Sequence, residues 1–289
     1  MKGPKIVPAN PESSRRRDDP DFSLVLGGPL YQLYLRTKLA RPPLELAIRR
    51  VVGIPLICWL PLLLLAAFAG RLISGVSIPF LLDVEVHIKF LVALPMLIAA
   101  EVVVDQRLSR IVAQFNERGI IAREDQSHFD GMIASAMRLR NSVIIEILLI
   151  AAVVAFGFWM WRGGKLTLSA ITVSSWYAVN EGAGLHLTSA GSYYALFGLS
   201  ILRFIMLRWY FRLFIWYRFL WQVRGLPLQL NLYHPDRAGG LGFLADTLIA
   251  FSPIFVAQSA SLAAVIFAQI RYTRNKLPDF TLEIAGVLL

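Results

Sequence analysis

The sequence predicts an all-α integral membrane protein with five transmembrane helices and the beginning of a sixth. Hydrophobic residues make up 56% of the 289 positions, charged residues only 17%, and the mean hydropathy is +0.59. A water-soluble domain carries about 25% charged residues, so an ordinary cytosolic enzyme and an intrinsically disordered chain are both excluded. The apolar residues also come in blocks of membrane-spanning length, and most of the 29 Lys and Arg residues lie between these blocks.

The first fifty residues are expected to lie outside the hydrocarbon. Residues 1–24 mix proline, serine and charged residues without an apolar period, which is typical of a disordered basic tail. Residues 25–50 place leucines beside Arg36, Lys38 and Arg41. This mixture favours an amphipathic segment at the membrane interface.

The helical transmembrane domain is expected over residues 51–289. Each span is judged against the ~20 apolar residues that cross ~30 Å of hydrocarbon. The nine residues Thr281–Leu289 are apolar but too few to cross alone, so they predict a partial sixth span. The five complete spans are expected at Val51–Gly70, Ile88–Val104, Val143–Trp161, from near Ser192 to Leu207, and Thr247–Ile270.

The distribution of Lys and Arg predicts the orientation of these spans. The segments up to Arg50, from Asp105 to Asn141 and from Arg208 to Gly240 together hold 21 of these residues, whereas the loops on the other side hold 6. Because positively charged loops stay in the cytoplasm, the N-terminus is expected to be cytoplasmic.

Helical periodicity continues beyond the second and fourth spans on the predicted inner side. Residues 105–141 repeat apolar side chains at helical spacing around a turn, which predicts a cytoplasmic helical hairpin. The fourth helix has neither proline nor glycine from Leu199 to Arg224, so it is expected to continue beyond the bilayer on the same side. Together with the hairpin, this extension is expected to form a cytoplasmic stalk. On the other side, the alternation in 165–179 predicts a short extracytoplasmic hairpin.

Three charged residues lie closest to hydrocarbon: Glu101, Arg203 and Asp246. Each costs about 2.5–3.5 kcal/mol at a helix centre. One interpretation makes them a conduction or proton path, or a gating ion pair between Glu101 and Arg203. The alternative places Glu101 one turn from water, extends Arg203 towards the cytoplasm, and puts Asp246 at a helix N-terminus.

Residues 203–224 interleave arginines with aromatic residues. Such a mixture can bind nucleic acid by stacking, but this helix emerges directly from a span, so membrane anchoring is favoured over nucleic-acid binding. Guanidinium groups then meet an anionic inner leaflet, and aromatic rings lie at headgroup depth. The expected interfacial anchors are Arg208, Trp209, Arg212, Trp216, Arg218 and Trp221.

A glycine-rich turn precedes the fifth span. Its backbone N–H groups, with a neighbouring arginine, form a candidate anion or lipid-phosphate site. The alternative is structural, with a histidine and an aspartate capping the start of the helix and the glycines allowing close packing. The residues concerned are His234, Asp236, Arg237, Gly239, Gly240 and Gly242.

No catalytic or metal-ligating group is predicted. The single cysteine, Cys58, lies in an apolar run, and the four histidines are widely separated. Neither a disulfide framework nor a metal site of helical spacing follows from them. No metal and no cofactor are therefore expected. An enzyme is the least favoured class of protein, although His234 and Asp236 could serve as an acid/base pair at the inner surface.

Several segments carry a family resemblance, among them RLRNSVIIEILLI, RWYFRLFIWYRFLWQV and HPDRAGGLGFL. Over most of Val51 to Glu283 the chain resembles a family of uncharacterised bacterial inner-membrane proteins. The resemblance implies a multi-pass protein of the bacterial inner membrane, with a sixth span in longer relatives. It implies no activity and no catalytic residues.

Two classes of function remain open. The first, which we favour, is an oligomeric channel or transporter-type protein of unknown substrate, because charged residues lie inside its spans. The second is a membrane-embedded sensor or scaffold that binds a cytoplasmic protein through the basic tail and the hairpin at 105–141.

Overall fold

The computed structural model describes residues 22–29, 32, 47–162, 174–180, 185–231, 233–273 and 275–288. These residues are mostly helical. The first half of the chain contains α3 (Ala47–Phe68), η1 (Phe80–Leu82), α4 (Val84–His87), the π-helical turn η2 (Ile88–Ala93), α5 (Leu94–Glu117), η3 (Arg123–Asp125), α6 (Gln126–Arg140) and α7 (Val143–Arg162).

The second half begins with a two-stranded antiparallel hairpin in which Val179 faces His186. Four α-helices and several short turns follow it in the described part of the chain. The elements are β1 (Ala178–Asn180), β2 (Leu185–Leu187), α8 (Ser189–Tyr193), the π-helical turn η4 (Tyr194–Gly198), α9 (Leu199–Val223), η5 (Gly242–Ala245), α10 (Asp246–Thr273), η6 (Leu277–Phe280) and α11 (Thr281–Leu288).

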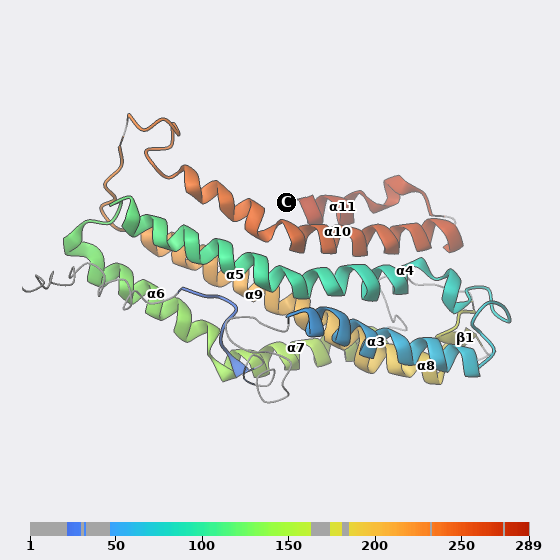
Figure 1. Cartoon of the computed structure of the whole chain (residues 1–289). Coiled ribbons are helices and arrows are strands. Elements are labelled where there is room, and N and C mark those ends of the chain that lie inside the picture. Colours follow the sequence, from blue (N-terminus) through green and yellow to red (C-terminus); the bar gives the residue numbers. More distant parts are fainter. Residues whose placement is uncertain are drawn as a thin grey trace, which may run out of the picture.

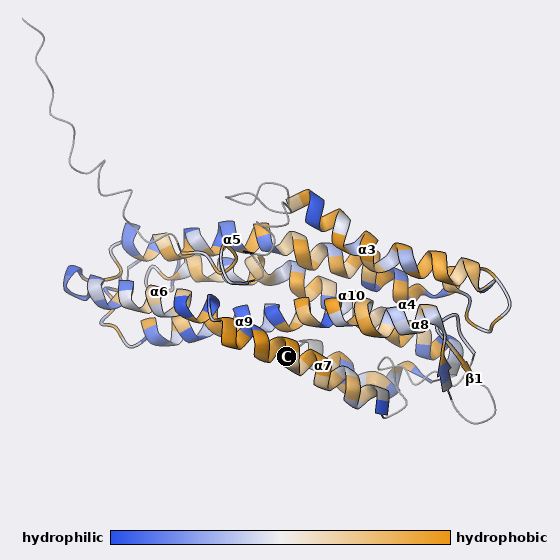
Figure 2. Cartoon of the chain, turned by 90° about the horizontal axis from the view of Figure 1, so that it is seen from below, coloured by the Kyte–Doolittle hydropathy of each residue, from blue (hydrophilic) through white to orange (hydrophobic). Residues whose placement is uncertain are grey.

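The helices form an elongated bundle (Figure 1). Helices α5, α9 and α10 run along its length, with α6 at one end and β1 and α8 at the other. Helices α3 and α10 pack on α5, and α6 and α7 pack on α9. Hydrophobic residues predominate along the middle of the bundle, whereas hydrophilic residues gather at the α6 end (Figure 2).

Five of the described helices are long and apolar enough to cross a membrane, as the sequence predicts. Their limits agree with the expected spans within a few residues, except that the second and fourth are longer. These segments are Ala47–Phe68, Val84–Glu117, Val143–Met160, Ser189–Val223 and Gly242–Tyr272. Residues 281–288 form α11, which lies along α10 (Figure 1). Its role as the start of a sixth span stays a prediction.

The helical hairpin predicted at 105–141 is formed by the end of α5, a turn, and α6. Gly119 ends α5 with a φ of 63°, a left-handed conformation that glycine adopts without steric cost. The β-hairpin lies at 178–187 and so begins later than the predicted 165–179, of which 165–173 fall outside the described residues. The position of either hairpin relative to a membrane stays a prediction.

The segment that begins at Phe22 is packed into the bundle. Phe22 and Leu24 are buried, and the Phe22 ring lies 5.8 Å from the Trp216 ring between centroids. The Ser23 hydroxyl donates to Asp105, and Arg140 donates to the Ser23 carbonyl. Residues 22–24 therefore do not belong to a disordered tail as predicted, because the backbone and side chain of Ser23 find partners inside the bundle. In the predicted tail and interfacial segment, the described residues do not include 1–21, 30–31 and 33–46.

Gly191 sets the distance between α8 and the start of the β-hairpin. A Cβ atom there would overlap the Tyr177 carbonyl oxygen, which also accepts a hydrogen bond from the Thr188 N–H at 3.0 Å. The Gly191→Ala variant is expected to lose about 1–3 kcal/mol of unfolding free energy through overpacking. Thermal unfolding in detergent, followed by circular dichroism, measures the loss.

The matched control is Gly131→Ala in α6, where an added Cβ meets nothing within 4 Å. Alanine in an exposed helix interior is favoured over glycine by about 0.5–1 kcal/mol. The control is therefore expected to melt at the wild-type temperature or above it. Equal melting temperatures for the two variants would contradict the close approach at Gly191.

Candidate functional site

A buried ion network joins three helices near the middle of the bundle. Glu101 of α5 accepts from Arg50 of α3 at 2.5 Å and from Arg212 of α9 at 3.0 Å. All three residues are buried. The predicted gating pair between Glu101 and Arg203 is therefore wrong, and so is the alternative that Glu101 reaches water, because the two other arginines enclose its carboxylate.

Several predicted interfacial anchors on α9 are core residues instead. Trp209 and Trp216 are buried, and the Trp209 indole N–H donates to the Leu97 carbonyl at 2.9 Å. Arg212 is 3% exposed and its guanidinium lies 4.5 Å from the Trp209 ring centroid. The anchoring prediction is wrong for these three residues because α5 and α6 cover this face of α9.

The other predicted anchors differ in exposure. Trp221 is 68% exposed, and the Arg224 guanidinium stacks on it at 4.0 Å. Arg218 donates to the Ser135 hydroxyl of α6 at 3.3 Å, and Arg208 is half-buried. Anchoring by Trp221 and Arg208 stays a prediction.

Arg203 points towards the end of the bundle that carries β1. Its guanidinium lies 5.3 Å from the Phe156 ring centroid and 3.5 Å from the Met160 sulfur, both on α7. Side chains in a helix lean towards its N-terminus, which for α9 is the β1 end. The predicted extension of Arg203 towards the cytoplasm is therefore wrong under the predicted orientation.

Arg203 forms part of the wall of a cavity of about 800 Å³. Helices α7, α9, α10 and α11 supply most of this wall, which is largely apolar. Of the polar residues in this wall, only Arg203 is one of the site residues predicted from the sequence. The polar wall residues are Lys89, Arg203, Tyr210, Gln258, Ser261 and Glu283.

Lys89 connects the cavity to a second buried polar cluster. Its ammonium group pairs with Glu85 one turn earlier. Next to this pair, the Asp83 carboxylate caps α4 by accepting from the Glu85 N–H at 3.0 Å, and it accepts from the Trp176 indole N–H at 2.8 Å. Burial, and then the nearby Glu85 carboxylate, raise the pKa of Asp83 to about 6, although Trp176, Val86 and Lys89 oppose the shift.

Both π-helical turns meet beside this cluster. The Phe90 ring of η2 lies 5.9 Å from the Tyr194 ring of η4, between centroids. A Cβ atom on Gly198 would approach the Phe90 ring to 2.8 Å, so glycine permits this close packing. π-Helical turns inside long helices occur frequently at functional sites.

The glycine-rich turn before α10 is organised by Asp236. Its carboxylate accepts from the backbone N–H groups of Ala238 at 2.9 Å, Gly240 at 3.1 Å and Gly242 at 2.8 Å. His234 lies 2.9 Å from the same carboxylate. Desolvation acts against the charge, but the three backbone donors outweigh it and hold the pKa of Asp236 well below its usual range.

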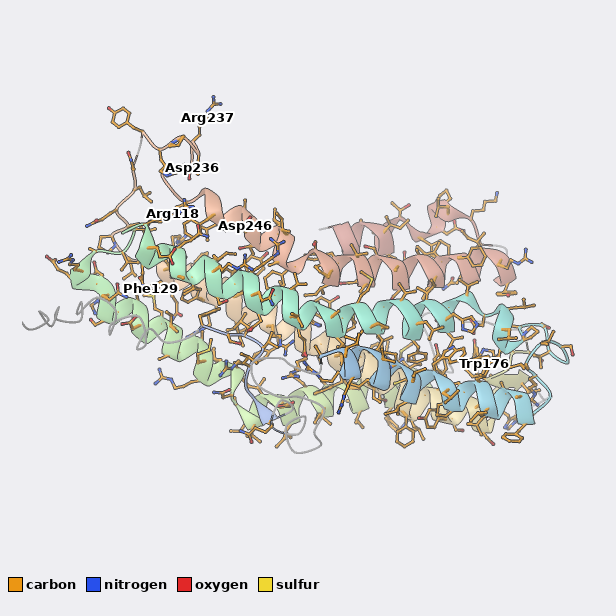
Figure 3. The ribbon with its side chains drawn as sticks, viewed as in Figure 1. Arg118, Phe129, Trp176, Asp236, Arg237 and Asp246 are labelled. Carbon is orange, nitrogen blue, oxygen red and sulfur yellow. The ribbon has the colours of Figure 1, made fainter. Side chains whose placement is uncertain are left out.

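This arrangement favours the capping interpretation of the turn, because Asp236 already occupies the N–H groups that an anion would need. Arg237 has a positive φ of 53° and points away from the helices (Figure 3). Arg118 joins the turn to α5 by donating to the Gly240 carbonyl at 3.2 Å. Asp246 is the first residue of α10 and half-buried, as expected for a helix N-terminus.

Among the residues that the structure describes, no group of three or more His, Cys, Asp or Glu side chains is arranged to hold a metal ion. The chain matches no protein-family model, no curated protein and no solved structure. The described fold is that of a helical protein with five segments able to span a membrane. The family resemblance stays a prediction.

Removing the charge of Glu101 should destabilise the protein strongly. In Glu101→Gln the two arginines stay buried and lose their carboxylate, and breaking a buried pair costs about 3–5 kcal/mol. Glu117→Gln, at the exposed end of the same helix, is the control and should change little. Thermal unfolding of both variants tests this, and similar melting temperatures would contradict the importance of the network.

Asp83 should make stability depend on pH. Its folded pKa of about 6 exceeds the ordinary 3.8, so the folded protein binds the proton more tightly than the unfolded chain. The contribution is therefore complete below about pH 3.8 and is lost as the pH rises through about 6. Between these values wild-type stability should gain up to about 1.4 kcal/mol per pH unit of acidification, relative to Asp83→Asn. The measurement is the melting temperature of both proteins at several pH values in this range. An equal change of melting temperature with pH in the two proteins would refute the prediction.

Proposed function

We propose that the chain is a transport-type protein of the bacterial inner membrane that binds an amphiphilic solute in the cavity between α7, α9, α10 and α11. The cavity is the observation that carries this proposal. Its volume of about 800 Å³ falls within the ~300–1,000 Å³ of small-molecule sites. Its wall is mostly apolar with a few polar groups, which is the usual composition of such a site.

The location of the cavity favours a binding site over a pore within one chain. Large buried side chains such as Trp209 and Phe90, together with the network around Glu101, fill the interior between the helices. The open space lies beside α9 instead, where a solute can arrive from the surrounding lipid. The homo-oligomer expected from the sequence, and a pore between its copies, stay predictions.

The alternative function, a scaffold that binds a cytoplasmic partner, has less support. The apolar face of α6 is used inside the chain, since Phe129 and Ile133 are buried and the Phe129 ring lies 5.9 Å from the Phe219 ring of α9. The predicted hairpin therefore offers a partner mainly its charged residues. The basic tail lies outside the described residues.

Filling the cavity tests the proposed function. Wild-type protein in phosphatidylcholine vesicles should speed the movement of fluorescent lysophospholipids between leaflets, measured by dithionite quenching of the outer leaflet. Ala152→Trp places an indole in the cavity wall and should reduce the rate of lysophospholipid movement at least about tenfold. A tenfold change corresponds to a loss of about 1.4 kcal/mol of binding free energy.

The matched control is Val154→Trp, which alters an exposed position on the same helix outside the cavity wall. It should keep the wild-type rate. A rate equal to that of protein-free vesicles for wild type, or equal loss in the two variants, would contradict the proposed function.

A further inference from the structure

We propose that Asp83 binds a proton together with an anionic amphiphile in the cavity, whose negative headgroup lies beside Lys89. This inference rests on the proposed function and adds to it the charge of the solute and a linked proton. Its basis is a row of buried charged residues at the β1 end of the bundle. The row begins at Asp83, continues with Glu85 and ends at Lys89, which is part of the cavity wall.

Asp83 is enclosed by protein and also lies at the end of a span. Its exposed fraction is 8%, and the next residue, Val84, begins the second segment that is able to cross a membrane. Trp176, which donates to the Asp83 carboxylate at 2.8 Å, lies at the same end of the bundle (Figure 3). In the predicted topology this end faces water, so a proton reaches Asp83 without crossing the hydrocarbon.

A proton is accommodated at Asp83 at lower cost than at Glu85. Among the described contacts, the Asp83 carboxylate accepts from two backbone N–H groups of α4 and from the Trp176 indole, which are uncharged donors. Glu85 instead holds the Lys89 ammonium group, and protonation there would break a buried ion pair. Burial, and then the charge of Glu85, raise the pKa of Asp83 to about 6. A proton from water therefore joins one carboxylate oxygen of Asp83 and converts it to the neutral acid.

Other ionisable side chains lie around this row. His87 is half-buried on α4, and its Nδ1 accepts from the Trp59 indole N–H at 3.0 Å. Arginine keeps its charge and tyrosine stays uncharged near neutral pH. The neighbours of these two types are Arg71, Tyr177, Tyr194, Arg203 and Tyr272. His87 is therefore the described neighbour outside the ion pair whose titration has to be distinguished from that of Asp83.

The charge of Asp83 acts on the cavity through its distance from Lys89. Lys89 follows Asp83 by six residues, or about 9 Å along the helix axis. Two unit charges about 10 Å apart change each other's binding by about tenfold at an effective dielectric constant of about 20. A negative headgroup beside Lys89 is therefore bound more tightly when Asp83 is neutral. By reciprocity, the bound headgroup increases the proton affinity of Asp83 by the same factor.

The ammonium group of Lys89 determines the sign of the solute charge. It has three N–H donors, so it can hold Glu85 and a headgroup at the same time. A cationic headgroup would be repelled by Lys89 and would oppose the proton at Asp83. An anionic headgroup has the favourable interaction with both.

A fluorescent alkyl sulfonate, whose charge does not change with pH, and the corresponding uncharged alkyl alcohol test this coupling. Fluorescence anisotropy gives the affinity of each probe for the full chain in phosphatidylcholine vesicles. Wild type should bind the sulfonate about tenfold more tightly at about pH 4.5 than at about pH 8, and the alcohol equally at both. Asp83→Asn imitates the neutral acid, so it should bind the sulfonate with the higher affinity at both pH values.

Two further variants identify the group that titrates. His87→Gln removes the neighbouring imidazole and should keep the wild-type ratio of the two affinities. Trp176→Phe removes a donor that stabilises the Asp83 carboxylate, so the pH midpoint of sulfonate binding should rise. This second variant keeps the test decisive if Asp83→Asn does not fold.

The possible outcomes separate the inference from the proposed function. Equal pH dependence of sulfonate binding in wild type and Asp83→Asn, or its loss in His87→Gln, overturns the inference. An unchanged midpoint in Trp176→Phe, or an equal pH dependence for the alcohol, does so as well. The proposed function stands in each of these cases if Ala152→Trp releases both probes from the cavity. Binding of both probes that Ala152→Trp does not reduce overturns the inference and the proposed function together.

Discussion

The carboxylate of Glu101, shared by Arg50 and Arg212, is the constraint on which the arrangement of the helices depends. A charge removed from water is tolerated only when it is paired. Loss of one partner leaves the remaining charges buried without compensation, which destabilises the fold strongly. The three residues come from α3, α5 and α9, so none of these helices can slide or rotate alone without separating the ions. Apolar packing alone restrains helices less inside a membrane, because lipid chains are equally apolar.

This constraint also determines which face of α9 is buried. Arg212 turns inward to Glu101, and Trp209 and Trp216, at spacings of three and four residues, lie on the same face and enter the core with it. Arg203 precedes Arg212 by nine residues, or about two and a half turns, and so lies on the opposite face. One helix thereby contributes a cation to the ion network on one side and a cation to the cavity wall on the other.

The sequence was sufficient to predict the five helices of membrane-spanning length, because long apolar runs have few alternatives to crossing a membrane. The described helices follow these apolar runs closely. It was not sufficient for the partners of Glu101, which lie 51 and 111 residues away along the chain. Arginines beside aromatic rings look alike whether they anchor at an interface or pair in a core, although the spacing of Trp209, Arg212 and Trp216 indicates a packed face. The cavity depends on where α11 packs, which no local pattern encodes.

The positions of the two polar clusters indicate where a transporter with this fold would move. Motion at Glu101 would separate buried ions, which is costly. At the β1 end, Lys89 belongs to the cavity wall and also to the cluster of Glu85 and Asp83 that Trp176 joins to the loop before β1. The two π-helical turns lie there, and such turns interrupt regular helical hydrogen bonding. In the proposed transporter, loading or release of a solute would therefore be less costly at the β1 end, while the network around Glu101 holds the helices in register.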